Sequence, residues 1–171
     1  VIERNSNRLL ELVNQLLDFR KIEEEMFILN RERTDINGIV RKVYAQYEYE
    51  ARAKNIDLRI ELPGEEVGCL VDAEAIFKVI SNLMSNAIKY SNEGGRIVIS
   101  VRETPTHAVI SVRDFGTGIS EENLPKLLNP EIHHTTYGTK NEEGSGLGLQ
   151  LVQDLTRRNG GELTIESTLG E

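Results

Sequence analysis

The sequence predicts an α+β fold, in which a two-layer α/β sandwich with a mixed, mainly antiparallel sheet follows a long N-terminal helix. Helical and strand patterns follow one another without the regular βαβ repeat that marks a parallel sheet. Two strand patterns, at 96–103 and 108–114, are separated only by a short turn around Pro105. That spacing predicts an antiparallel hairpin, so we expect helices packed against a sheet that is mainly antiparallel.

The composition is typical of a globular protein and argues against several functions. Charged residues make up 28% of the 171 residues and hydrophobic residues 39%, which is enough to bury a sizeable core. A formal net charge of −8 without any Lys/Arg run argues against nucleic acid as a partner. The single Cys69 permits neither an intrachain disulfide nor a cysteine-rich zinc site, and a reducing cytoplasm fits it.

The chain starts in the middle of a helical pattern and stops just after a strand pattern, so we expect it to be a piece of a longer protein. No apolar stretch approaches the ~20 residues that span a bilayer, and no signal peptide is recognisable.

Residues 1–29 contain no proline or glycine and predict one continuous helix. Ile2, Leu9 and Leu16 recur every seven residues, with Leu12 and Phe19 at the intervening positions. A narrow apolar stripe with polar residues on every other side is typical of a helix that pairs with another helix. Dimerisation through this coiled-coil-like helix is the favoured interpretation, and packing on its own domain is the alternative.

The next part of the chain predicts two helices separated by short strands. A linker is expected near 29–33, and either Thr34 or Asp35 caps the first helix. Strict alternation over 56–62 predicts a strand that ends at a Pro-Gly turn, and 67–71 is a candidate second strand. Asp72 then caps a helix that runs to about Ser91.

The last third predicts a short helix, a long irregular segment, a second helix and a strand. The short helix starts at Ser120, the second helix covers about 147–158, and the strand covers 162–167 after a Gly-Gly turn. The irregular segment between the helices, about 127–146, is too long for an ordinary loop. Its polar, pliable composition predicts a lid that orders over a bound ligand.

Four polar residues of the helix that follows Asp72 share one face. Asn82, Asn86, Lys89 and Tyr90 are spaced i, i+4, i+7 and i+8. Asparagine is a poor helix former, so two of them in mid-helix on one face need a reason. An amide oxygen is a hard ligand suited to Mg²⁺, which takes phosphate oxygens and waters for the rest, and Lys89 adds positive charge for phosphate. A merely solvated polar face is the alternative.

Asp114 ends the second strand of the hairpin, and Gly116, Gly118 and Ile119 follow it in a turn. A carboxylate there accepts a hydrogen bond from the exocyclic amine of adenine, whereas guanine presents a carbonyl at that position. The pattern therefore predicts selection of ATP over GTP, with glycines that permit close approach of the base. A turn that simply closes a hairpin is the alternative.

A glycine-rich stretch opens the helix at about 147–158. Its free backbone N–H groups and the positive end of the helix dipole are suited to a phosphate. Each of the three motifs is weak alone, but their order along the chain predicts one nucleotide site. The residues of the stretch are Gly144, Ser145, Gly146, Leu147, Gly148 and Leu149.

With these motifs, the chain resembles the catalytic ATP-binding domain of bacterial sensor histidine kinases, in the superfamily shared with gyrase, the MutL repair proteins and a heat-shock chaperone. Residues 82–90 are similar to the N box of that family, and 114–119 and 144–149 to its two glycine boxes. Residues 8–19 resemble the second helix of its dimerisation and phosphotransfer domain. The resemblance implies a Bergerat-type fold at 30–171, preceded by part of that helical domain at 1–29.

The resemblance also implies the ligand and the role of each motif. Mg²⁺ would be held by Asn86, and ATP phosphates would be contacted by the catalytic residues Asn82 and Lys89. Tyr90 would lie near the base or ribose, Asp114 would recognise adenine within 114–119, and the backbone of 144–149 would hold phosphate.

The implied reaction is transfer of the ATP γ-phosphoryl group to a histidine on a separate helix. Relatives that hydrolyse ATP carry a glutamate where this chain has Asn82, and a neutral amide is no general base. Since His107, His133 and His134 do not match the acceptor, we expect the chain alone to bind nucleotide without labelling itself. Implied partners are a homodimer mate and a response-regulator receiver domain, in the cytoplasmic portion of a membrane-anchored kinase.

Three departures from the family leave other interpretations open, the first being that no histidine of this chain matches the acceptor. Leu127 and Leu128 stand where a phenylalanine is usual in the lid, and the closing strand of the family would begin just beyond Gly170. A degenerate regulatory module that binds nucleotide without transfer is the main alternative. A serine kinase of an anti-sigma pathway is a further one, and the dimer-type helix at 1–29 argues against it.

Overall fold

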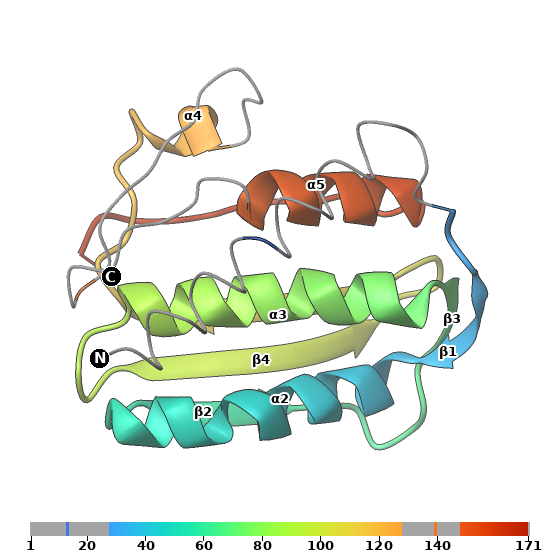
Figure 1. The fold of residues 1–171 in the computed structure, drawn as a ribbon, viewed down its shortest axis with the longest axis horizontal. Coiled ribbons are helices and arrows are strands. Elements are labelled where there is room, and N and C mark those ends of the chain that lie inside the picture. Colours follow the sequence, from blue (N-terminus) through green and yellow to red (C-terminus); the bar gives the residue numbers. More distant parts are fainter. Residues whose placement is uncertain (1–12, 14–27, 128–138, 140–147, 171) are drawn as a thin grey trace.

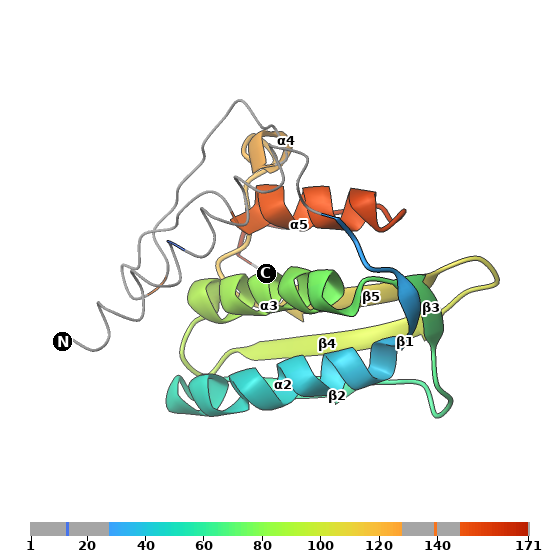
Figure 2. The same cartoon turned by 45° about the vertical axis from the view of Figure 1, so that its right-hand side comes forward.

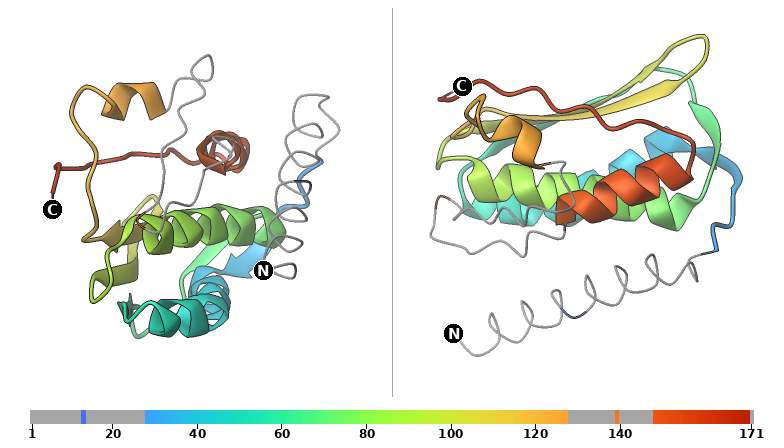
Figure 3. Two further views of the ribbon diagram at one scale, coloured as in Figure 1. Left: turned by 60° about the vertical axis from the view of Figure 1, so that its left-hand side comes forward. Right: turned by 90° about the horizontal axis from the view of Figure 1, so that it is seen from above.

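The computed structural model describes residues 13, 28–127, 139 and 148–170. In Figures 1 and 2, α2 (Ile36–Ala53) and α3 (Ala73–Tyr90) run side by side over the sheet, and α5 (Gly148–Arg158) lies along α3 on the side away from α2. Figure 3 shows from above that these helices form one layer and the sheet the other. The predicted two-layer α+β sandwich is therefore confirmed.

The main sheet contains β2 (Asp57–Glu61), β4 (Arg96–Glu103) and β5 (Ala108–Asp114), in the order β2-β4-β5. β2 runs parallel to β4, while β4 and β5 form the antiparallel hairpin, so the sheet is mixed as predicted. A separate antiparallel pair is formed by β1 (Glu32–Asp35) and β3 (Gly68–Val71). The register puts Asp114 opposite Ile97, at the end of the hairpin that lies nearest the C-terminus of α3.

Side-chain caps begin the two long helices where the sequence predicted them. The Asp35 carboxylate accepts the N–H groups of Asn37 and Gly38, both at 3.0 Å, which decides between Thr34 and Asp35 as the first cap. The Asp72 carboxylate accepts the Ala75 N–H at 2.9 Å and starts α3. These caps fix where each of the two helices begins.

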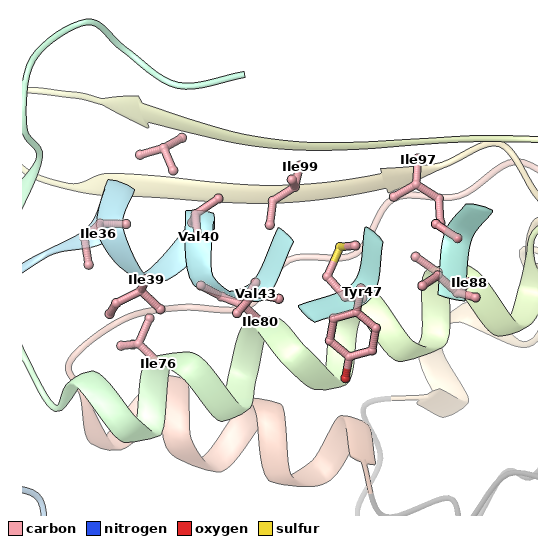
Figure 4. Packing of buried hydrophobic residues seen from close by; sticks show 14 of the residues in the cluster. Ile36, Ile39, Val40, Val43, Tyr47, Ile76, Ile80, Ile88, Ile97 and Ile99 are labelled. Carbon is pink, nitrogen blue, oxygen red and sulfur yellow. The ribbon is translucent and has the colours of Figure 1, made fainter. Parts of the chain in front are cut away.

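The main core fills the space between α2, α3 and the sheet (Figure 4). Val40 and Val43 of α2 and Ile80 of α3 are wholly buried against Ile97 and Ile99 of β4. Each such side chain contributes about 1.5–3 kcal/mol on burial. A second, smaller core joins α3 to α5. Its buried members are Ala75, Val79, Leu151, Val152 and Leu155.

α3 thus uses two faces for packing, one on the sheet and α2 and one on α5. The face that remains carries the polar residues of the first motif. The fold therefore presents Asn82, Asn86, Lys89 and Tyr90 on a helix whose orientation is set by two cores.

Three expectations about secondary structure need correction. Part of the expected linker at 29–33 belongs to β1, because Glu32 and Arg33 pair with Val71 and Leu70. The short helix, α4 (Leu124–Leu127), starts beyond Ser120, since the Ser120 carbonyl first accepts the N–H groups of Asn123 and Leu124 in a turn.

The strand predicted at 162–167 is wrong. The backbone there is outside any sheet, although Leu163, Ile165 and Ser167 keep the alternation of half-buried side chains. Side-chain and turn contacts hold its end instead of a strand ladder: the Ser167 hydroxyl accepts the Ile119 N–H at 2.9 Å, and Gly170 donates to the Thr117 carbonyl at 3.0 Å.

The predicted helix at 1–29 lies outside the described residues except for Val13, which is helical, and Ile28 and Leu29, which are not. Most of the predicted lid lies outside them as well, apart from Leu127 and Thr139.

Candidate functional site

The middle of the polar face of α3 lies against the start of α5. The Nδ2 group of Asn82 donates to the Lys78 carbonyl one turn back at 2.9 Å. A Cβ atom added at Gly148 would lie 3.0 Å from the Asn82 Oδ1 atom. The side chain of Asn82 therefore contacts the first residue of α5, and a glycine at 148 lets the two helices approach closely there.

The C-terminal part of this face presents an amide and an ammonium group. Asn86 is half-buried, and none of the described residues forms a hydrogen bond with its side chain. The Lys89 Nζ atom lies 5.0 Å from the centroid of the Tyr90 ring, a cation–π contact. Asn86 is one helical turn from both Asn82 and Tyr90, so an oxygen donor and a cation occupy one stretch of the helix surface.

The first glycine motif contacts the end of α3 directly. Gly116 is buried, and a Cβ atom there would lie 2.4 Å from the Tyr90 carbonyl oxygen. Thr117 donates its N–H to the same oxygen at 3.2 Å. Only a residue without a side chain allows this approach, so Gly116 joins the turn after β5 to the last turn of α3.

Asp114 lies at this junction. Its Oδ1 atom accepts the Gly116 N–H at 3.1 Å, and its carboxylate is half-buried. Burial raises the pKa of Asp114 above its ordinary value, and the hydrogen bonds from backbone N–H groups oppose part of that rise. The hydrogen bond from the Gly116 N–H fixes one carboxylate oxygen against the turn.

Gly118 and Ile119 contact the C-terminal segment of the described chain. Gly118 has φ of +64°, and a Cβ atom there would lie 2.0 Å from the Thr168 carbonyl oxygen. Ile119 donates its N–H to the Ser167 hydroxyl. The second glycine of the motif thus has a structural use that sequence reasoning missed, since the partner segment is remote along the chain.

The structure therefore brings two of the three predicted motifs together and part of the third. The residues of α3 meet Asp114 and Gly116 through the Tyr90 carbonyl, and Gly148 lies beside Asn82. Leu149 lies in the first turn of α5. Gly144, Ser145, Gly146 and Leu147 lie outside the described residues.

Replacing Gly116 with alanine is expected to destabilise the chain by about 1–3 kcal/mol, since the new methyl group meets the Tyr90 backbone and forces it to shift. Gly64→Ala is the matched control, because a Cβ atom at Gly64 has no neighbour within 4 Å. Thermal unfolding followed by circular dichroism measures both. Equal melting temperatures for the two variants would show that the Gly116–Tyr90 approach is not tight.

Sequence reasoning also missed Lys54. It is only 6% exposed, and its Nζ atom contacts the backbone carbonyls of Ile88 and Lys89 at the end of α3. A lysine near the end of an amphipathic helix normally lies in solvent. No local pattern in the sequence predicts this burial, because the partners of Lys54 lie 34 and 35 residues further along the chain.

The donor set fits a hard metal ion only together with a ligand that brings oxygens of its own. No group of three or more His, Cys, Asp or Glu side chains that could hold a metal occurs in the described part of the chain. The amide oxygen of Asn86 suits Mg²⁺ when phosphate oxygens and waters complete the coordination shell of the ion. Within the described ranges, no helix is long and apolar enough to cross a membrane.

Comparison with known proteins agrees with the resemblance drawn from the sequence. A family profile described as histidine kinase-, DNA gyrase B-, and HSP90-like ATPase matches residues 71–171, more than half of the chain. The chain is 34% identical over 170 residues to the histidine protein kinase DivJ of Caulobacter vibrioides. That alignment covers 99% of this chain and 28% of DivJ, so the chain spans little more than a quarter of that relative.

Solved structures share the fold. The nucleotide-free catalytic domain of histidine kinase ThkA matches with a TM-score of 0.66 and 30% identity, covering 76% of this chain and 82% of that chain. Histidine kinase ThkA in complex with the response regulator protein TrrA matches with a TM-score of 0.72 and 28% identity. The second match covers 94% of this chain and 43% of that chain.

Proposed function

Because this chain belongs to the family of histidine kinase-, DNA gyrase B- and HSP90-like ATPases, we propose that it is the ATP-binding part of a sensor histidine kinase. In this proposal it transfers the γ-phosphoryl group of ATP to a histidine on a separate helix. The observation that carries the proposal is the contact at Gly116, which puts the Asp114 carboxylate beside the end of α3. A single nucleotide can therefore contact the Asp114 carboxylate with its base and the polar face of α3 with its phosphates.

Each residue has a role that follows from its chemistry. The Asp114 carboxylate accepts a hydrogen bond from the adenine amine, with the backbone of Gly116, Gly118 and Ile119 beside the base. Tyr90 lies near the base or ribose. The carbonyl oxygen of Asn86 coordinates Mg²⁺, which neutralises charge on the phosphates when bound.

The phosphates are contacted by the side chains of Asn82 and Lys89. Backbone N–H groups at the start of α5 hold them from the other side, in the stretch that contains Gly144, Ser145, Gly146, Leu147, Gly148 and Leu149. Positioning and charge neutralisation supply most of the catalysis in phosphoryl transfer, so no general base on this chain is needed to cleave the phosphoanhydride bond. Asn82 also explains why water is a poor acceptor here, since its amide has no basic site.

The remaining parts of the proposal concern the parent protein. Residues 1–29 are part of its dimerisation and phosphotransfer helices, and 30–171 are its catalytic domain with a lid at about 127–146. A response-regulator receiver domain is the expected next acceptor. The likeness to ThkA, which was solved together with a response regulator, supports that partner. The parent is expected to be membrane-anchored, with this portion in the cytoplasm.

The test is phosphotransfer between separate proteins. The 171-residue chain is mixed with labelled Mg-ATP and a histidine-bearing helical hairpin from the parent kinase. Acid-labile phosphate is expected on the hairpin, and none on the chain when it is incubated alone. Mg-ATP binding without transfer would support a regulatory module instead, and no binding at all would refute both.

A further inference from the structure

Lys54 forms a buried polar contact that the proposed reaction does not use. It follows the last turn of α2 and is only 6% exposed. Its Nζ atom donates to the Ile88 carbonyl at 2.7 Å, to the Lys89 carbonyl at 3.2 Å and to the Thr139 Oγ1 atom at 2.7 Å. These partners lie far from Lys54 in the sequence, so the contact joins three separate parts of the chain.

Such a site is costly unless every group in it is satisfied. An ammonium group removed from water loses several kcal/mol that only close acceptors restore. The carbonyls at the end of an α-helix lack partners within the helix, and they form the negative end of its dipole. Lys54 therefore supplies a positive charge at the point where α3 has unsatisfied acceptors.

Thr139 completes the contact from the other side. Its N–H donates to the Lys89 carbonyl at 3.1 Å. Its hydroxyl accepts from Lys54 and lies 3.1 Å from the Lys89 carbonyl and 3.0 Å from the Ser91 carbonyl, so its single proton donates to one of the two. These bonds hold Thr139 itself against the last turn of α3.

The same turn of α3 is held on both sides. The Tyr90 carbonyl accepts the Thr117 N–H from the turn after β5, while the Ile88 and Lys89 carbonyls are bound by Lys54 and Thr139. The backbone of Lys89 is thus fixed by these partners, while its Nζ atom lies over the ring of the neighbouring Tyr90.

We propose that Lys54 is a positioning residue for the nucleotide site: through Thr139 and the Lys89 carbonyl, it fixes the position of the last turn of α3, which carries Lys89 and Tyr90. The inference rests on the proposed function, because its effect is expressed on bound nucleotide. Lys54 touches neither base nor phosphate in this scheme and acts only through Lys89 and Thr139.

The test compares two variants that each remove one side of the contact. Lys54→Met keeps the length and apolar volume of the stem but removes the ammonium group, and Thr139→Val keeps the shape but removes the hydroxyl. Lys54→Arg and Thr139→Ser are the conservative counterparts. Lys42→Met, at an exposed lysine of the same helix, is the matched control.

Calorimetry on the 171-residue chain gives the dissociation constants for Mg-ATP and for adenosine. Each disruptive variant is expected to weaken Mg-ATP binding by about 10-fold, the size of a hydrogen bond to a charged group. Binding of adenosine, which has no phosphates, stays near the wild-type value. The Lys54→Met/Thr139→Val double variant loses no more than either single variant, because both changes break one contact. Thr139→Ser restores most of the affinity.

Other outcomes overturn the inference. If Thr139→Val binds Mg-ATP as the wild type does, or if the two losses multiply in the double variant, Lys54 has only a structural role and the proposed function stands. Equal losses for adenosine and Mg-ATP also assign it a general structural role. If Lys54→Met does not fold, the Thr139→Val and Thr139→Ser pair decides alone. If the wild-type chain binds no Mg-ATP, the proposed function fails and this inference with it.

Discussion

Replacing Asp114 with asparagine is expected to weaken ATP binding by about 10- to 100-fold, the cost of losing one hydrogen bond to a charged group. The asparagine Oδ1 atom keeps the hydrogen bond from the Gly116 N–H that Asp114 accepts at 3.1 Å. Its Nδ2 group then points toward the base, where it meets the amine of adenine as donor against donor. Guanine presents a carbonyl at that position, so GTP binding is expected to increase.

Calorimetry with Mg-ATP and Mg-GTP measures the two dissociation constants and so the change in nucleotide preference. Asp154→Asn is the control, since Asp154 lies on α5 and forms a partly exposed ion pair with Arg157 at 3.0 Å. If the Asp114→Asn variant binds ATP and GTP with unchanged affinities, the Asp114 carboxylate does not recognise the base.

The same substitution is expected to raise the melting temperature of the nucleotide-free chain at neutral pH. Burial raises the pKa of Asp114, so the charged carboxylate destabilises the folded state relative to the unfolded one. Below the ordinary pKa of 3.8 the group is protonated in both states and this penalty is absent. The gain from asparagine is therefore full at pH 7 and shrinks as the pH falls through the raised pKa toward 3.8. Scanning calorimetry across this pH range measures it.

Replacing Asn86 with alanine is expected to lower the rate of phosphotransfer by about 10²-fold or more, the usual effect of removing one electrostatic contact to a transferring group. No described residue forms a hydrogen bond with the Asn86 amide, so removing it breaks no hydrogen bond within the described part of the chain. Alanine is also the better helix former, and the melting temperature should not fall. A loss of transfer with the fold intact would therefore assign Asn86 to the chemistry.

The measurement is the initial rate of phosphate appearance on the histidine-bearing hairpin, at several Mg²⁺ concentrations. Asn92→Ala is the matched control, because Asn92 is exposed in the turn just after α3. Transfer by Asn86→Ala at the wild-type rate would remove Asn86 from the metal site. So would a loss of transfer that tracks a loss of folded protein.

Features that depend on local chemistry could be predicted from the sequence. The caps Asp35 and Asp72 start α2 and α3 by binding backbone N–H groups within three residues. The hairpin strands have the predicted bounds, because alternation and a short turn decide them. The spacing of Asn82, Asn86 and Tyr90 decides that they share a face of α3. Their roles with ATP stay predictions.

Features that depend on remote partners could not be predicted. β1 is a strand only because Glu32 and Arg33 find β3 across the chain. Residues 162–167 have the alternation of a strand but no ladder partner among the described residues. Gly118 contacts the remote Thr168, and Lys54 contacts the end of α3. No local pattern in the sequence reveals either contact.

The parallel pairing of β2 with β4 has a consequence for synthesis on the ribosome. Asp57 pairs with Arg96, and the whole of α3 is translated between them. At a translation rate of about 5–20 residues per second, roughly 2–8 seconds pass between the synthesis of β2 and that of β4. During that interval Ile80 and Ile88 have no β4 to cover them, and a nascent chain that pauses there offers this apolar surface to chaperones or to other nascent chains.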